Sequence, residues 1–125
     1  MAEGKLVRKS ELQLLGIRVS EEGGGVRYLE GAKHGLSTSI YEGEVAPGSG
    51  PGEHTHPYVE FAVVCAGRAS YTIGGKTFEA ESGDVVIIPA GELHDFSNPD
   101  NTVLKLIAIH EAPAHAGSHL SKTAL

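Results

Sequence analysis

Short apolar runs recur along the chain, and clusters of glycine, proline, serine and aspartate separate them. The runs GIRV, VRYLEG and LSTSIYEGEV come before a turn-forming segment, APGSGPG, and the runs VEFAVVCAG, VVIIP, LHDFSN and TVLKLIAI come after it. Apolar runs of about four to eight residues between turn signals are typical of β-strands. The pattern therefore predicts many short strands and no long helix.

The clearest local signal is a hairpin in RASYTIGGKTFEA. Gly74 and Gly75 separate two extended segments, and a two-residue hairpin turn requires the positive φ angles that glycine adopts without steric cost. The ends of the chain are less regular. Residues 1–16 fit either a helical turn or an edge strand, and the tail from His110 fits a loose extension or a short helix. The whole pattern predicts an all-β sandwich or small barrel.

Length and composition agree with a single β-rich domain over residues 1–125. The chain has 17 glycines, 6 prolines and a hydrophobic fraction of 40%, which suits strands and turns better than a helical bundle. The formal net charge of -6 makes nucleic acids and anionic membranes poor partners. A single cysteine, Cys65, rules out an internal disulfide, and the first residues lack the apolar core of a signal peptide. We therefore expect a cytoplasmic protein without a membrane span.

One segment, PGEHTHPYVEF at residues 51–61, carries the residues that suggest chemistry. Side chains alternate across a strand, so His54 and His56 point the same way and Glu60 has the same parity. Two imidazoles and a carboxylate are three metal donors, and a fourth would come from another strand. His94 begins a predicted strand directly after a turn and is placed to reach across an interior. The alternative is that the paired histidines are solvated residues of a loop.

The other histidines have simpler interpretations. His110 ends the last strand, where it either lines the barrel mouth or is a plain strand-end residue, and His34 lies in a loop-like segment. His115 and His119 are four residues apart, but Gly117 between them argues against a helix. We therefore expect both of these histidines to be solvated in the tail.

The strand VEFAVVCAG is apolar on both faces. Ala62 and Val64 share the parity of Glu60, and their small side chains leave room beside it. Phe61 and Cys65 lie on the opposite face, so Cys65 is not expected to be a ligand. Two apolar faces must both be covered, one by the interior and the other by a second chain or the N-terminal segment. We expect a homodimer.

Two segments resemble the motifs of the cupins and together indicate a small single-domain bacterial cupin. The first motif fits residues 48–67 and the second fits residues 83–98. The resemblance implies an antiparallel double-sheet barrel, or jelly roll, of six to eight strands. Its core would span about residues 17–110, with short extensions at both ends. The matching positions are Gly48, His54, His56, Glu60, Gly67, Gly83, Pro89, Gly91, His94 and Asn98.

The resemblance also implies roles for particular residues. His54, His56, Glu60 and His94 would be metal ligands inside the barrel, and Asn98 would be a structural residue near the end of the second motif. This donor set, three imidazoles and one carboxylate, suits divalent Fe, Mn, Ni, Zn, Co or Cu. On a six-coordinate ion it leaves two positions for water or for a small chelating molecule.

Two classes of function are compatible with such a site. The first is a metal-dependent enzyme, a dioxygenase, isomerase or decarboxylase acting on a small oxygenated metabolite. The second is a metal- or ligand-binding module without turnover, because a fold does not settle a function. The residues expected to contact a small-molecule ligand are Tyr41, Tyr58, Phe96 and His110, although aromatic residues in a small barrel also serve as plain core.

Overall fold

The computed structural model of the protein describes residues 3–15 and 25–116. These described residues form nine strands and two short 3-10 turns, η1 (Lys9–Glu11) and η2 (Gly31–His34). The predicted strand GIRV and most of the SEEGGG turn lie outside the described residues. The strands are β1 (Gln13–Leu15), β2 (Gly25–Leu29), β3 (Ser39–Val45), β4 (Glu60–Ala66), β5 (Arg68–Ile73), β6 (Lys76–Glu81), β7 (Val85–Ile88), β8 (His94–Ser97) and β9 (Leu104–His110).

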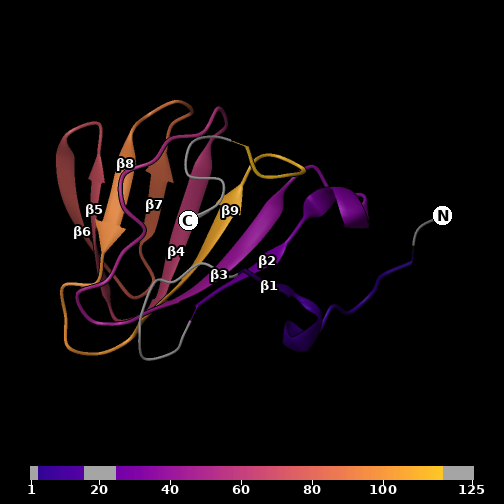
Figure 1. Ribbon diagram of the computed structural model, residues 1–125, viewed down its shortest axis with the longest axis horizontal. Coiled ribbons are helices and arrows are strands. Elements are labelled where there is room, and N and C mark those ends of the chain that lie inside the picture. The colour runs from indigo at the N-terminus through magenta and orange to yellow at the C-terminus, as the bar shows by residue number, and fades with distance from the viewer. Residues whose placement is uncertain (1–2, 16–24, 117–125) are drawn as a thin grey trace.

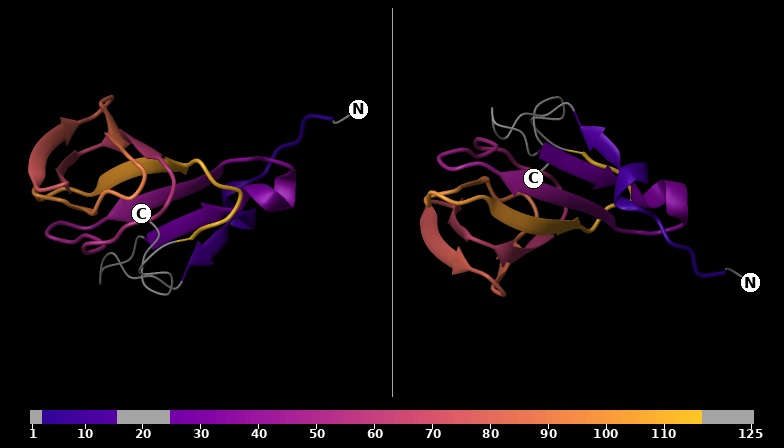
Figure 2. Two further views of the ribbon diagram at one scale, coloured as in Figure 1. Left: turned by 90° about the horizontal axis from the view of Figure 1, so that it is seen from above. Right: turned by 90° about the horizontal axis from the view of Figure 1, so that it is seen from below.

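The strands form two antiparallel sheets. The larger sheet has the order β1-β2-β3-β9-β4-β7, and the smaller has the order β6-β5-β8. In Figure 1 the smaller sheet lies beside the β7 edge of the larger one, and the views in Figure 2 show it curving back over that sheet. The predicted antiparallel double-sheet fold is confirmed. The described residues contain one strand more than the upper number expected, because the N-terminal segment forms both alternatives in turn, the 3-10 turn η1 and then the edge strand β1.

Strand β4 lies between β9 and β7, and its side chains alternate as the sequence predicts. Glu60, Ala62 and Val64 are buried on the inner face, whereas Cys65 is an exposed, free thiol. The inner faces of both sheets supply the apolar core. For example, Tyr71 of β5 packs against Phe96 of β8 with ring centroids 5.1 Å apart.

Several residues predicted to be structural fill the expected places. Gly74 and Gly75 have φ angles of 55° and 84° and form the turn between β5 and β6, so the predicted hairpin is confirmed. Asn98 is buried, and its side-chain amide donates hydrogen bonds to the carbonyl oxygens of Val45 (2.9 Å) and Thr102 (2.7 Å). It thereby ties the end of the second motif to the end of β3.

The loop between β3 and β4 runs alongside β8 and brings the two predicted motifs together. The backbones of His54 and His94 exchange hydrogen bonds of 2.9 and 3.0 Å. Further back in the loop, a Cβ on Gly50 would lie 2.1 Å from the carbonyl oxygen of Phe96, so the loop can approach the strand this closely only with glycine there. Backbone pairing with the second motif therefore fixes the position of the first.

Candidate metal centre

The four residues expected to be metal ligands converge inside the fold. His54 and His56 come from the loop before β4, Glu60 is the first residue of β4, and His94 is the first residue of β8. All four are buried, with at most 2% of their surface exposed. Ionisable side chains are rarely buried to this degree unless they are paired or bind a metal.

The three histidines of this set are oriented by the backbone in the same way. The Nδ1 atom of His54 donates to the carbonyl of Gly52 at 2.7 Å, and that of His94 donates to the carbonyl of Glu92 at 2.8 Å. The Nδ1 atom of His56 likewise lies 2.9 Å from the carbonyl oxygen of Tyr58. For His54 and His94, a carbonyl that accepts Nδ1–H fixes the tautomer in which Nε2 carries the lone pair, which is the arrangement found around metal-binding histidines. Nε2 of His56 makes a hydrogen bond of 2.8 Å with Oε1 of Glu60, which a bound ion would replace.

The carboxylate of Glu60 lies at the centre of the cluster. Its Oε1 atom is 2.8 Å from Nε2 of His56, 3.2 Å from Nε2 of His110 and 3.5 Å from Nε2 of His94. Burial alone raises the pKa of Glu60, but the surrounding histidines outweigh it and hold that pKa well below its usual range. The site thus contains an ionised carboxylate surrounded by imidazoles.

The imidazoles themselves differ in basicity. Burial lowers the pKa of His54 to about 4. Burial also lowers the pKa of His94, but the Glu60 carboxylate and the Glu92 carbonyl outweigh it and raise the pKa above the usual value. His54 therefore stays neutral into acid, whereas the Glu60 carboxylate favours the protonated form of His94.

His110 is brought to the same centre by the pairing of β4 with β9. It stands directly opposite Glu60 in the register of these strands and is fully buried. Its Nδ1 atom is 2.9 Å from the Tyr58 hydroxyl, and its ring is 4.4 Å from that of Tyr41. Of the two interpretations of His110, the structure favours the one in which it lines the interior.

The other residues expected to contact a ligand have different surroundings. Tyr58 stacks on His56 with ring centroids 4.3 Å apart and an angle of 7°. Tyr41 is buried between Tyr28 and His110. Phe96, by contrast, packs against Tyr71 in the apolar core. Tyr58 and Tyr41 therefore border the histidine cluster directly, and Phe96 supports it from the core.

One prediction about the tail is wrong. His115 is not solvated: it is partly buried, and its Nδ1 atom lies 3.1 Å from the Tyr58 hydroxyl. The backbone N–H of His115 donates to the hydroxyl of Tyr28 at 3.1 Å. The segment after β9, which contains His115, passes toward η2 (Figure 1). No local pattern signals this contact, because it depends on where the tail is held by tertiary structure. His119 lies outside the described residues.

The donors fit a divalent metal ion. Among the described residues, the buried donor atoms that lie within 4.8 Å of one another form two trios, His54–Glu60–His94 and His56–Glu60–His110. Imidazole nitrogen and carboxylate oxygen are ligands that Mn, Fe, Co, Ni, Zn and Cu share. A donor set of this kind, buried and with its histidine rings oriented by backbone carbonyls, is suited to hold such an ion.

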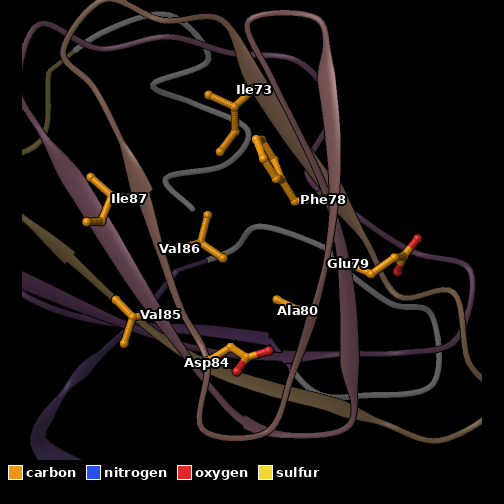
Figure 3. A pocket seen from close by; sticks show the side chains of 8 residues that line it. All are labelled: Ile73, Phe78, Glu79, Ala80, Asp84, Val85, Val86 and Ile87. Carbon is orange, nitrogen blue, oxygen red and sulfur yellow. The ribbon is translucent and has the colours of Figure 1, made fainter.

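A groove elsewhere on the molecule offers no comparable chemistry. It lies between β6 and β7, and Figure 3 shows that aliphatic and aromatic side chains line most of it. Its two carboxylates, on Glu79 and Asp84, have no histidine beside them in the groove. Within the described residues, no helix is long and apolar enough to cross a membrane.

Comparison with known proteins establishes the family. The sequence model of the cupin domain matches residues 41–110. The chain belongs to the cupin family. This confirms the resemblance on which the ligand set was predicted. Over 96 residues this cupin is also 27% identical to an uncharacterized protein of Streptomyces coelicolor, a match that covers 77% of this chain and 87% of that one.

Solved structures of oxalate decarboxylase share the fold. One, from Bacillus subtilis and described by its Mn(II) centres, is 25% identical with a TM-score of 0.73, and the match covers 83% of this chain and 30% of that chain. A further oxalate decarboxylase structure, described by its substrate-binding mode and a switch of reaction specificity, is 24% identical with a TM-score of 0.78, and the match covers 91% of this chain and 31% of that chain. The cupin chain thus spans about 30% of the length of these enzymes.

Proposed function

We propose that this cupin binds one divalent transition-metal ion through His54, His56, Glu60 and His94. The observation that carries the proposal is the common orientation of the three histidines, whose Nδ1 atoms face backbone carbonyls while a buried carboxylate lies among their Nε2 atoms. Manganese is the first metal to test, because a neighbour that is 25% identical is described by its Mn(II) centres. Iron, nickel, zinc, cobalt and copper use the same donors.

We further propose that the ion serves an enzyme that acts on a small oxygenated metabolite. A divalent ion with one carboxylate ligand keeps a net charge of about +1, so the site favours an anionic ligand, and a small carboxylic acid such as oxalate is the first class to test. When bound, the ion supplies Lewis-acid catalysis or, if it is redox-active, reaction with dioxygen. The protein contributes a buried environment, and the ring of Tyr41 lies 4.4 Å from that of His110.

A metal-binding module without turnover is the second candidate. The donors are at most 2% exposed, and the C-terminal segment is hydrogen-bonded to Tyr58 and Tyr28 beside them. Such enclosure favours retention of an ion over rapid exchange of substrate and product. Oxygen uptake and decarboxylation assays on the metal-loaded protein, with a panel of small acids and diols, distinguish the two candidates.

The direct test is the metal content of protein prepared without a metal-binding tag, measured by elemental mass spectrometry. We expect about one ion per chain in the natural protein and a near-complete loss in Glu60→Ala, His54→Ala and His94→Ala. Glu79→Ala is the matched control, because Glu79 is an exposed carboxylate on β6, and it should keep the ion. Metal retained by the three site variants at the natural level would refute the assignment.

We also propose that the protein is a cytoplasmic homodimer that pairs through the outer face of the larger sheet. Five apolar side chains stand side by side in register across that face. Ile87 is 67% exposed and Ile40 is 37% exposed, so a second chain would remove a continuous apolar band from water. The exposed thiol of Cys65 on the same face suits a reducing compartment. The row consists of Leu29, Ile40, Ile109, Phe61 and Ile87.

A further inference from the structure

The His56–Glu60–His110 trio contains a residue that the family's motifs do not include. His110 is fully buried, and its Nε2 atom makes no hydrogen bond within the described part of the chain, although it lies 3.2 Å from Oε1 of Glu60. A buried polar atom without a hydrogen bond is uncommon and calls for an explanation. A bound cation would supply the missing partner.

The other side of the His110 ring is held in place. Its Nδ1 atom is 2.9 Å from the hydroxyl of Tyr58, and the same hydroxyl is 3.1 Å from Nδ1 of His115. The hydroxyl has one hydrogen, which it can donate to His115 while it accepts Nδ1–H of His110. In that arrangement the lone pair of His110 is on Nε2, facing Glu60.

The two trios share the single carboxylate of Glu60. Two divalent ions side by side would carry four positive charges against one negative charge, and at such short range their repulsion is severe. One ion that draws donors from both trios avoids this problem. We propose that His110 is a fifth protein ligand of the metal ion, and that Tyr58 and His115 are positioning residues for it.

This proposal rests on the proposed metal binding and changes what the site can accept. Five protein donors on a six-coordinate ion leave one open position. The ion then takes a ligand through one donor atom, and a chelating ligand can bind with two atoms only if a protein donor leaves.

The decisive measurement is the number of imidazoles bound to the ion, counted by pulsed electron paramagnetic resonance on protein loaded with Cu(II). We expect four in the natural protein, three in His110→Ala, and four in the control His34→Ala, whose histidine lies in η2 away from the site. Competition with a chelator should show the dissociation constant for the metal rising about tenfold or more in His110→Ala, and by about tenfold in Tyr58→Phe.

A ligand titration tests the open position. Azide offers one donor atom and oxalate offers two, so removal of His110 should strengthen oxalate binding relative to azide. If only three imidazoles bind the metal in the natural protein, this inference is overturned and the proposed function stands. A stoichiometry of two ions per chain has the same consequence. A natural protein that binds no metal overturns both. The count in the natural protein decides the matter even if His110→Ala does not fold.

Discussion

The hydroxyl of Tyr58 allows a sharp test of the buried network in the metal-free protein. In Tyr58→Phe the ring still stacks on His56 at 4.3 Å, but the hydroxyl no longer reaches Nδ1 of His110 or His115. His110 is fully buried, so its Nδ1 atom loses a partner that water cannot replace. A buried polar group left unsatisfied costs about 1–3 kcal/mol, and we expect the free energy of unfolding to fall by about that amount.

Tyr71→Phe is the matched control because it removes the same atom from a different environment. The Tyr71 hydroxyl is buried and has no hydrogen-bond partner among the described residues, and its side chain is 1% exposed. Deleting a hydroxyl that is already unsatisfied removes a desolvation penalty instead of creating one. We expect Tyr71→Phe to be neutral or more stable than the natural protein by up to about 1 kcal/mol.

Urea titration followed by circular dichroism measures both variants. In thermal unfolding, a loss of 1 kcal/mol corresponds to a shift of roughly 3 to 5 °C for a chain of this length. Loss of a hydroxyl should therefore lower the free energy of unfolding in Tyr58→Phe and leave it unchanged or raise it in Tyr71→Phe. If Tyr58→Phe lies within about 0.5 kcal/mol of the natural protein, or if Tyr71→Phe is the more damaging change, the hydrogen-bonded network contributes nothing and the argument fails.

Four further predictions use simpler readouts. Burial lowers the pKa of His54 from 6.5 to about 4, so on acidification His54 is protonated in the unfolded chain before it is protonated in the folded one. The urea midpoint of the metal-free protein should therefore fall as the pH drops from about 6.5 to 4, and a midpoint that does not change with pH would contradict this. The raised pKa of His94 has the opposite effect on stability. Because the metal binds neutral imidazole, protons compete for His94, and the affinity for the metal, measured by competition with a chelator, should fall as the solution is acidified. Ile87→Glu should convert the proposed dimer to a monomer in light scattering, whereas Val103→Glu, at an exposed apolar position outside the strands, should not. Gly50→Ala should lose about 1–3 kcal/mol of stability through overpacking and weaken metal binding, since its Cβ would lie 2.1 Å from a backbone oxygen of β8; unchanged metal affinity would show that the loop is not held there.

The strands and the positions of the candidate ligands in the motifs could be predicted because their signals are local. Apolar runs between turn residues mark β4 and β9, and the alternation along β4 correctly separates Glu60 from Cys65. The spacing of His54 and His56 from Glu60 likewise needs only the sequence. Such patterns reflect how one segment of backbone orients its own side chains, and they do not depend on which strand lies next to it.

The rest of the site depends on pairing between distant segments. The sequence places His110 at the end of a strand but does not reveal that β9 runs beside β4, which is what sets His110 opposite Glu60. The burial of His115 depends on the path of a tail without regular secondary structure, held by the hydroxyls of Tyr28 and Tyr58. Contacts of this kind leave no periodic pattern in the sequence. The sequence alone therefore shows only the immediate neighbours of both histidines and not their contacts in the fold.

The candidate ligands come from both sheets, so a bound ion would affect how the two sheets are held together. Glu60 begins a strand that is paired on both sides, and His110 ends the strand next to it, so the larger sheet holds these two firmly. His94 belongs to the smaller sheet, and His54 is held by backbone pairing with His94. An ion bound by donors from both sheets would therefore add a direct link between them. Because such an ion would bind the folded chain in preference to the unfolded one, its binding free energy would add to the stability of the fold. The contribution should be largest for the loop that carries His54 and His56.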